Sequence, residues 1–161
     1  MAARLTAQDV FEFLSPKQLD IISGQSNRIQ MKAGEIVYKM GEPADHLYTV
    51  LDGQVALRLP GKGGTSVLID QLTKGATFGS CVSFQGGTYA LTAQCTEDTE
   101  MLMTRASVLK SLMDDDLVMG YAIQSRISEI YFGRYLETMN KLQAIVMNLP
   151  IEPPAASDGV A

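Results

Sequence analysis

Cysteine and histidine are scarce in this chain of 161 residues, which contains two cysteines, Cys81 and Cys95, and one histidine, His46. Two cysteines do not make a disulfide framework in a chain of this size. A zinc site needs about four cysteine, histidine or carboxylate ligands in a close pattern, and these three residues are too scattered to supply it. A nucleophile would also lack its usual base. We therefore expect no metal site and no enzymatic activity.

Positive charge and long apolar runs are lacking as well. The net charge is −5 and the isoelectric point is about 4.8, which argues against a nucleic-acid partner because phosphate contacts need clustered Lys and Arg. The longest apolar run, residues 117–123, is too short to span a bilayer. The N-terminal sequence MAARLTAQDVFEF does not have the pattern of a signal peptide. These features predict no membrane insertion and a cytoplasmic location.

What is present is the composition of a folded domain, with 46% hydrophobic and 19% charged residues. The N-terminal third predicts two short helices. Thr6 can cap the first of them. The run SPKQ, residues 15–18, predicts the start of the second, with Ser15 as N-cap, proline in the first helical position and glutamine three residues after the cap. This second helix should end near Gly24.

The middle third alternates between apolar and polar residues in short runs separated by turn residues. Asp52-Gly53 lies between two such runs, which is a strong hairpin signal. The expected strands are residues 28–32, 35–39, 47–51, 54–59, 66–70, 89–95 and 100–104. Short strands at this spacing predict a small barrel or jelly roll.

The last third is predicted to be helical. A short helix is expected over residues 107–113, and a long one from about residue 117 to 149, a stretch without proline. Asp114, Asp115 and Asp116 place negative charge where the long helix begins, which is favourable at its positive end. Pro150 should end this helix, and residues 150–161 have the composition of a disordered tail.

Two apolar stripes run along the predicted long helix. Ile123, Ile127 and Ile130 form the first, and the second follows the spacing of 3 and 4 residues typical of a coiled coil. The members of this second stripe are Phe132, Tyr135, Met139, Leu142, Val146 and Leu149. A helix of about 33 residues is roughly 50 Å long, more than the barrel can cover. We expect a homodimer through Phe132, Tyr135, Met139, Leu142 and Val146; alternatively, both stripes pack on the chain's own barrel.

The segments AGEIVYKMGEPADHLYTVLDGQVAL, residues 33–57, and LTKGATFGS, residues 72–80, carry a distinctive order of glycines. This order resembles the cyclic nucleotide-binding domain, the sensor module of catabolite activator proteins, protein kinase A regulatory subunits and gated channels. The matching positions are Gly34, Ile36, Gly41, Tyr48, Val50, Gly53, Val55, Gly75, Phe78, Gly79, Ala90, Thr92 and Asp98. The resemblance covers about residues 15–113, and the long helix stands where the family's C-helix would.

The resemblance implies a mainly β fold with flanking helices (α+β), a small β-roll of the cyclic nucleotide-binding type. We divide the chain into the β-roll with its N-terminal helices, residues 1–116, the long helix, residues 117–149, and the tail, residues 150–161.

The family's phosphate-binding loop reads Phe-Gly-Glu, a short helix, then Arg-Ala-Ala-Thr, where the Glu takes the ribose hydroxyl and the Arg pairs with the cyclic phosphate. Here Ser80 stands in place of that Glu and Tyr89 in place of that Arg. No basic residue occurs between Lys74 and Arg105. Losing both anchors weakens binding by roughly two or more powers of ten. The loop therefore predicts a retained shape with weak, altered or lost binding of cyclic nucleotide, and no other cofactor is indicated.

The candidate pocket residues are Gly79, Ser80, Cys81, Val82, Thr88, Tyr89, Ala90 and Thr92. The hydroxyl groups among them could donate to a ligand, or could instead cap the loop's helix and satisfy strand edges. Cys81, at the start of that helix, is either a redox-sensitive switch or a small buried apolar residue. Arg58 could reach the pocket from a neighbouring strand, or could point to solvent.

Three functions stay open at this point. The first is a stand-alone regulatory module that acts through contact with an unknown protein partner, since the sequence shows no winged helix-turn-helix, kinase or channel region. The second is a receptor for cyclic AMP, cyclic GMP or another small ligand held by unusual contacts. The third is an assembly subunit that docks on a larger complex.

Overall fold

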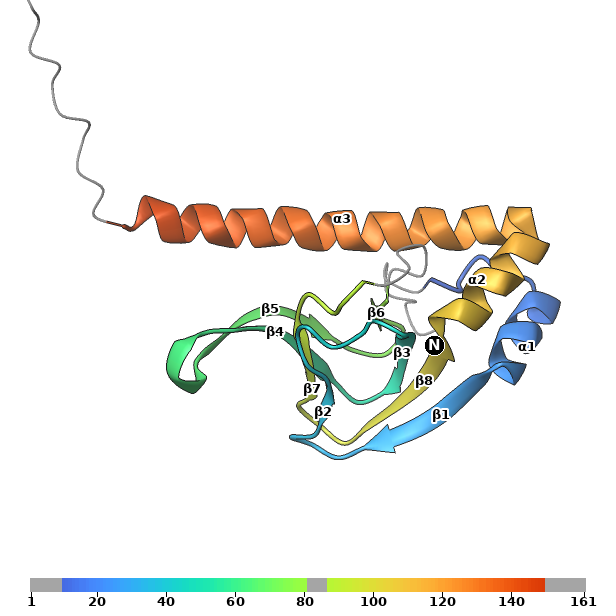
Figure 1. Ribbon diagram of the computed structural model, residues 1–161, viewed down its shortest axis with the longest axis horizontal. Helices are drawn as coiled ribbons and strands as arrows, with labels where there is room; N and C mark the ends of the chain where they lie inside the picture. The colour runs from blue at the N-terminus through green and yellow to red at the C-terminus, as the bar shows by residue number, and fades with distance from the viewer. Residues whose placement is uncertain (1–9, 81–86, 150–161) are drawn as a thin grey trace, which may run out of the picture.

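The computed structural model describes residues 10–80 and 87–149, and it forms a β-roll beneath one long helix (Figure 1). The helices are α1 Pro16–Gly24, α2 Ala106–Asp115 and α3 Leu117–Met147, with a 3-10 turn at Lys62–Gly64. The strands are β1 Ser26–Met31, β2 Ile36–Tyr38, β3 His46–Asp52, β4 Val55–Pro60, β5 Ser66–Leu72, β6 Thr77–Gly79, β7 Thr92–Cys95 and β8 Thr99–Arg105. The predicted β-roll with flanking helices is confirmed.

The strands form two antiparallel four-stranded sheets, one in the order β1-β8-β3-β6 and the other in the order β2-β7-β4-β5. The inner faces of the two sheets enclose one apolar cluster that includes Val50, Val55, Leu72, Phe78 and Met101. The predicted hairpin at Asp52-Gly53 is wrong: the turn joins β3 to β4, but these strands lie in different sheets and pair with other strands, so the turn leads the chain from one layer of the roll to the other.

Two further details of the strand prediction are wrong. The three-residue strand β6 was not predicted because it is too short to alternate; pairing with β3 holds it in place. The strand predicted over residues 89–95 begins only at Thr92. The reason is that the Tyr89 backbone bonds to the loop before β3, donating to the Glu42 carbonyl and accepting from the Gly41 N–H, instead of joining the ladder.

The capping box of α1 is formed as predicted. The Ser15 N–H donates to Gln18 Oε1 over 3.0 Å, and the Gln18 N–H donates to Ser15 Oγ over 3.3 Å. The helix ends at Gly24. For the earlier predicted helix, Thr6 lies outside the described residues, and residues 10–13 form a turn.

The long helix α3 is one unbroken element of 31 residues that passes through Gly133. Its N-cap is Asp116, whose side chain accepts a hydrogen bond from the Met119 N–H over 3.0 Å. Gly120 lets α2 approach closely, because a Cβ at this position would lie 2.5 Å from the Met113 carbonyl oxygen. A side chain at residue 120 would therefore force α2 and α3 apart.

The two stripes of α3 have different surroundings. Ile123, Ile127 and Ile130 are buried in a second apolar cluster with residues of α1 and α2 and the segment before α1, so the first stripe packs on the chain's own domain. The second stripe is exposed along the distal half of the helix, which lies above the β4–β5 hairpin (Figure 1). Within the described part of the chain, no helix has the length and apolar character needed to cross a membrane.

Candidate functional site

A cavity of about 200 Å³ lies between α3 and the β-roll. Strands β2, β4 and β5 contribute Tyr38, Leu57 and Ile69, and α3 contributes Tyr131, Arg134, Tyr135 and Thr138. Gly79, Tyr89, Ala90 and Leu91 come from the two ends of the segment between β6 and β7, which corresponds to the family's phosphate-binding loop and is called the phosphate loop below. Of the sequence candidates, Gly79, Tyr89 and Ala90 therefore lie together at one cavity. The site also contains four residues of α3 that were not pocket candidates; one of them, Tyr135, was predicted at the dimer seam instead.

Tyr89 is folded inward and is 6% exposed. Its ring is stacked on that of Tyr38, with centroids 3.6 Å apart and planes 12° from parallel. The Tyr89 hydroxyl lies 3.2 Å from both the backbone nitrogen and the carbonyl oxygen of His46, accepting from the first and donating to the second. Burial raises the pKa of the Tyr89 phenol, so the side chain stays neutral at physiological pH. An uncharged, hydrogen-bonded ring thus stands where the family resemblance expects a cation.

The aromatic residues behind this stack form one group. Tyr48 and Phe78 are stacked with ring centroids 5.2 Å apart, and Tyr38 lies 5.8 Å from Tyr48 and 6.0 Å from Phe78. Burial raises the pKa of Tyr38 and of Tyr48, because an ionised phenolate would be desolvated there. The interior of the roll next to the cavity is therefore aromatic and uncharged.

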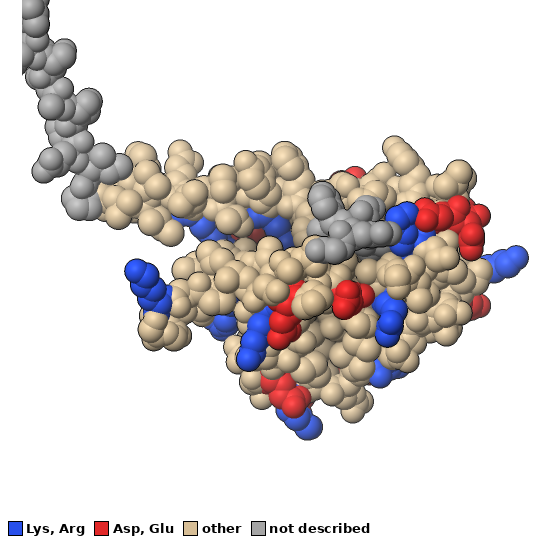
Figure 2. All heavy atoms as spheres, in the orientation of Figure 1, with Lys and Arg blue, Asp and Glu red and all other residues tan. Residues whose placement is uncertain are grey.

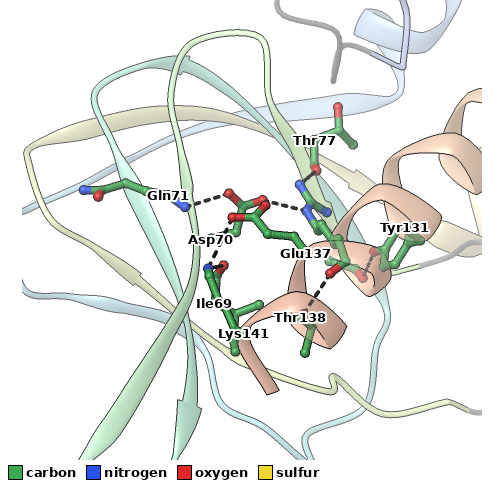
Figure 3. A network of polar contacts seen from close by, with 10 residues as sticks. Ile69, Asp70, Gln71, Thr77, Tyr131, Glu137, Thr138 and Lys141 are labelled. Atoms are coloured by element: carbon green, nitrogen blue, oxygen red, sulfur yellow. Dashed lines mark hydrogen bonds and ion pairs between the residues drawn. The ribbon is translucent and has the colours of Figure 1, made fainter. Parts of the chain in front are cut away.

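Among the described residues that line the cavity, the one basic side chain comes from α3, and it was not among the sequence candidates. Arg134 is 9% exposed, and its Nε donates to Asp70 Oδ2 of β5 over 3.0 Å. Its Nη2 donates to the Thr77 carbonyl over 2.6 Å, and its guanidinium lies 5.6 Å from the ring centroid of Tyr131. The Asp70 side chain is itself only 13% exposed, so the two charges form a largely buried ion pair (Figure 3).

The sequence did carry a signal for Arg134. The stripe of Ile123, Ile127 and Ile130 is buried, and the next position on that face is 134. An arginine on a face that is otherwise isoleucine needs a buried acceptor, which Asp70 and the Thr77 carbonyl supply. No pattern in the sequence indicated which strand would provide that acceptor.

Further polar contacts hold α3 on the same two strands (Figure 3). The Tyr131 hydroxyl donates to the Gly79 carbonyl of β6, and Lys141 Nζ donates to the Ile69 carbonyl of β5. Lys141 Nζ also lies 3.3 Å from Glu137 Oε1. Together with the pair of Arg134 and Asp70, these bonds tie α3 to the strands that lead into the phosphate loop.

Gly79 has a backbone reason to be glycine. Its φ is +105°, and a Cβ there would lie 2.6 Å from the His46 carbonyl oxygen. The next residue, Ser80, is buried, and its N–H donates to that same carbonyl over 2.8 Å. The entry to the phosphate loop is thus fixed against β3.

The two threonine candidates make contacts outside the cavity. Thr92 Oγ1 accepts a hydrogen bond from the Met40 N–H over 3.0 Å, so this hydroxyl satisfies a neighbouring backbone group, as the structural alternative expected. Thr88 is exposed and forms an isolated bridge with Pro43. Neither residue lines the cavity as described.

The remaining candidates give different outcomes. Cys81 and Val82 lie outside the described residues, so the proposed switch at Cys81 stays a prediction. Arg58 is half-buried, and its Nε is enclosed without a hydrogen-bond partner in the part of the chain that the structure describes. It neither lines the cavity nor extends freely into solvent, so both expectations for it need correction. Within residues 10–80 and 87–149 there is no cluster of three or more metal-binding side chains.

Two curated relatives match most of this chain. The sequence is 27% identical over 115 residues to lysophospholipase nte1 of Emericella nidulans, a match that covers 71% of this chain and 7% of the relative. It is 20% identical over 151 residues to the cAMP-dependent protein kinase regulatory subunit of Dictyostelium discoideum, covering 93% of this chain and 45% of the relative. The chain therefore spans less than half the length of either curated relative.

Two solved structures share the fold. The catabolite activator protein of Thermus thermophilus superposes with a TM-score of 0.71 at 22% identity, covering 86% of this chain and 63% of that one. The c-di-GMP responsive global regulator CLP of Xanthomonas campestris superposes with a TM-score of 0.71 at 18% identity, covering 90% and 77%. The sequence model described as the cyclic nucleotide-binding domain matches residues 28–116. The chain belongs to the cyclic nucleotide-binding domain family.

Proposed function

We propose that this chain is a regulatory module of its family in which the pocket does not hold a cyclic nucleotide at physiological concentrations, and in which α3 delivers the output by contact with protein. The observation that supports this most directly is the inward stack of Tyr89 on Tyr38. The residue that would pair with a phosphate in the family pattern is here an uncharged side chain whose hydroxyl is already bonded to His46.

Charge and size support the same conclusion. Arg134 is bonded to Asp70, so a phosphate approaching it would have to displace a carboxylate and would meet that negative charge in a poorly solvated place. The cavity of about 200 Å³ is also below the roughly 300–1,000 Å³ of sites for drug-sized ligands, the class to which a cyclic nucleotide belongs. The negative charge of Asp70 and the small volume of the cavity both disfavour binding of a bulky anion.

The distal half of α3 supports output through protein contact. Phe132 is 61% exposed, Tyr135 55% and Leu142 49%, and they lie at coiled-coil spacing along one side of the helix. In the view of Figure 2 the outer edge of this half carries no charged atoms, while charged side chains gather between the helix and the roll. A second copy of the chain is the partner we propose for this stripe, because two such stripes are self-complementary.

The test of the nucleotide proposal is calorimetric titration of the purified protein with cyclic AMP and cyclic GMP up to millimolar ligand. We expect no binding heat. A second readout is thermal unfolding at 1 mM ligand, where a Kd of 10 μM would raise the free energy of unfolding by about 2.7 kcal/mol. Binding at micromolar or lower Kd in either assay would overturn the proposal and favour a cyclic nucleotide receptor with unusual contacts.

An assembly subunit is a second candidate, because the exposed stripe of α3 would also suit a different protein. The two ideas separate in sizing experiments. A dimer of the isolated chain supports pairing through a second copy. A monomer at high concentration would instead indicate that the exposed stripe of α3 binds a different protein.

A further inference from the structure

We infer that the cavity beneath α3 binds a small uncharged aromatic molecule of one or two fused rings. This inference rests on the proposed function, because it takes the same pocket from which the nucleotide is excluded and assigns it another class of ligand. The structural basis is the combination of aromatic walls, a neutralised charge and a small volume.

The walls favour an aromatic ligand. Four of the lining residues are tyrosines, at positions 38, 89, 131 and 135, and three are aliphatic, Leu57, Ile69 and Leu91. Aromatic rings attract one another in offset-stacked or edge-to-face arrangements, which a planar guest can adopt against several of these walls at once. An aliphatic guest would gain only from burial of apolar area.

The charge of the cavity favours an uncharged ligand. Arg134 is the one ionisable cation in the lining as described, and Asp70 lies 3.0 Å from its Nε. The pair is neutral as a unit, and both side chains are mostly buried. A charged guest would give up its hydration without meeting an uncompensated opposite charge, whereas a neutral guest has no such cost.

Several polar groups of the lining are engaged within the protein. The Gly79 carbonyl accepts from Tyr131, and the Thr138 hydroxyl donates to the Arg134 carbonyl over 2.8 Å. A ligand rich in hydrogen-bonding groups would have to break these contacts. A ligand with few such groups can enter without disturbing them, which again selects an apolar ring system.

The volume limits the size of the guest. An apolar cavity of about 150 Å³ takes up benzene, and drug-sized ligands need roughly 300 Å³ or more. At about 200 Å³, this cavity fits between the two. One ring or two fused rings, such as indole, fill it.

The experiment titrates the protein with indole. The chain has no tryptophan, so emission excited at 295 nm comes from the ligand, and its fluorescence anisotropy reports binding directly. We expect a dissociation constant below about 1 mM. Indole-3-acetate and tryptamine carry a negative and a positive charge on the same ring system, and each should bind at least about tenfold more weakly. Tighter binding of either charged analogue than of indole overturns the assignment of an uncharged ligand.

Two matched variants locate the site. Ala90 lines the cavity and is exposed, so Ala90→Phe should fill the cavity while leaving the core intact, and should reduce indole affinity at least about tenfold. Ala33 is an exposed alanine in the turn before β2, and Ala33→Phe should leave indole affinity unchanged. Unchanged affinity in Ala90→Phe, or absence of indole binding to the parent protein, overturns the inference.

The outcome is separable from that of the proposed function. If neither indole nor cyclic AMP binds, this inference is wrong and the proposed function is still supported. Tight binding of cyclic AMP removes the proposed function, and indole competition with the nucleotide then shows whether the ring of the ligand alone suffices for the same cavity.

Discussion

The ring of Tyr89 lies almost parallel to that of Tyr38, with centroids 3.6 Å apart. Tyr38 belongs to β2, whereas Tyr89 follows the phosphate loop, so the contact joins two segments that are distant in sequence. It also joins the aromatic interior of the roll to the wall of the cavity. Tyr89, at the position where the family pattern has a ligand-binding arginine, here packs against the protein's own interior.

Two substitutions of Tyr89 separate the roles of ring and hydroxyl. Tyr89→Phe keeps the stack and loses the hydrogen bonds to His46, so the free energy of unfolding should fall by about 1 kcal/mol. Tyr89→Ala also removes the ring and leaves a cavity, so the fall should be about 3–4 kcal/mol. Urea denaturation measures both. Equal losses for the two variants would mean that the stack contributes nothing to stability.

The buried pair of Arg134 and Asp70 should matter more than a pair on the surface. Arg134→Met leaves Asp70 mostly buried without its partner, and we expect the free energy of unfolding to fall by about 3 kcal/mol. Arg28→Met breaks the pair of Arg28 and Glu100, in which the arginine side chain is 71% exposed, and should cost less than about 1 kcal/mol. Adding Asp70→Leu to Arg134→Met should recover part of the loss. Failure to recover any of it would show that the charge left on Asp70 is not the cause.

Dimerisation through α3 can be tested by placing the same charge at two adjacent residues of the helix. Met139 belongs to the second stripe of α3, and Asn140, the next residue, is exposed but points about 100° away from it around the helix. Met139→Glu should convert a dimer into a monomer in light scattering coupled to size exclusion, because like charges would face each other across the seam. Asn140→Glu adds the same charge and should leave the dimer intact. A parent protein that is monomeric at 100 μM would contradict the proposed partner.

Asp116 should make the stability of the domain sensitive to acid. The Met119 N–H and the Gln18 side chain bond to its carboxylate, and these bonds lower the pKa of Asp116. A lowered pKa in the folded state means that the stabilisation is complete above the unfolded value, about 3.9, and is lost as pH falls through the folded value.

The corresponding variant is Asp116→Asn, which should be less stable than the parent at pH 7, with a difference that shrinks below about pH 4. Asp115→Asn removes an equal charge from an exposed neighbour that makes neither bond, and it should alter the pH profile less. Thermal melts from pH 2.5 to 7 test this. A constant difference between Asp116→Asn and the parent over the whole range would exclude titration of Asp116 as the cause.

Local rules predicted most of the fold. The capping box at Ser15 and the charge before α3 involve residues within one turn of each other, and their geometry follows from the sequence alone. The order of glycines predicted the roll, and Gly79 shows why, since its φ and its approach to His46 exclude a side chain. The exceptions are β6, the start of β7 and the hairpin predicted at Asp52-Gly53, and all three depend on pairing partners elsewhere in the chain.

The site was harder to predict, for a related reason. Sequence showed that Tyr89 cannot replace an arginine chemically, but not that its ring would turn inward onto Tyr38. It showed no cation near the loop, while the structure brings Arg134 to the cavity from a helix more than forty residues further along the chain. The way α3 packs on the roll determines that Arg134 reaches this cavity. Sequence periodicity predicts only which face of the helix Arg134 occupies.

The position of α3 also protects a sheet edge at which chains could aggregate. Strand β5 is the last in its sheet, and it carries the exposed side chains of Val67 and Leu68. An uncovered edge of this kind is a template on which another extended chain can add. By bonding to the carbonyl of Ile69 and the carboxylate of Asp70, α3 occupies part of that edge. A variant or modification that frees the helix would therefore create a nucleus for fibrous aggregation, so the same bonds that hold the helix in place also act as a safeguard on solubility.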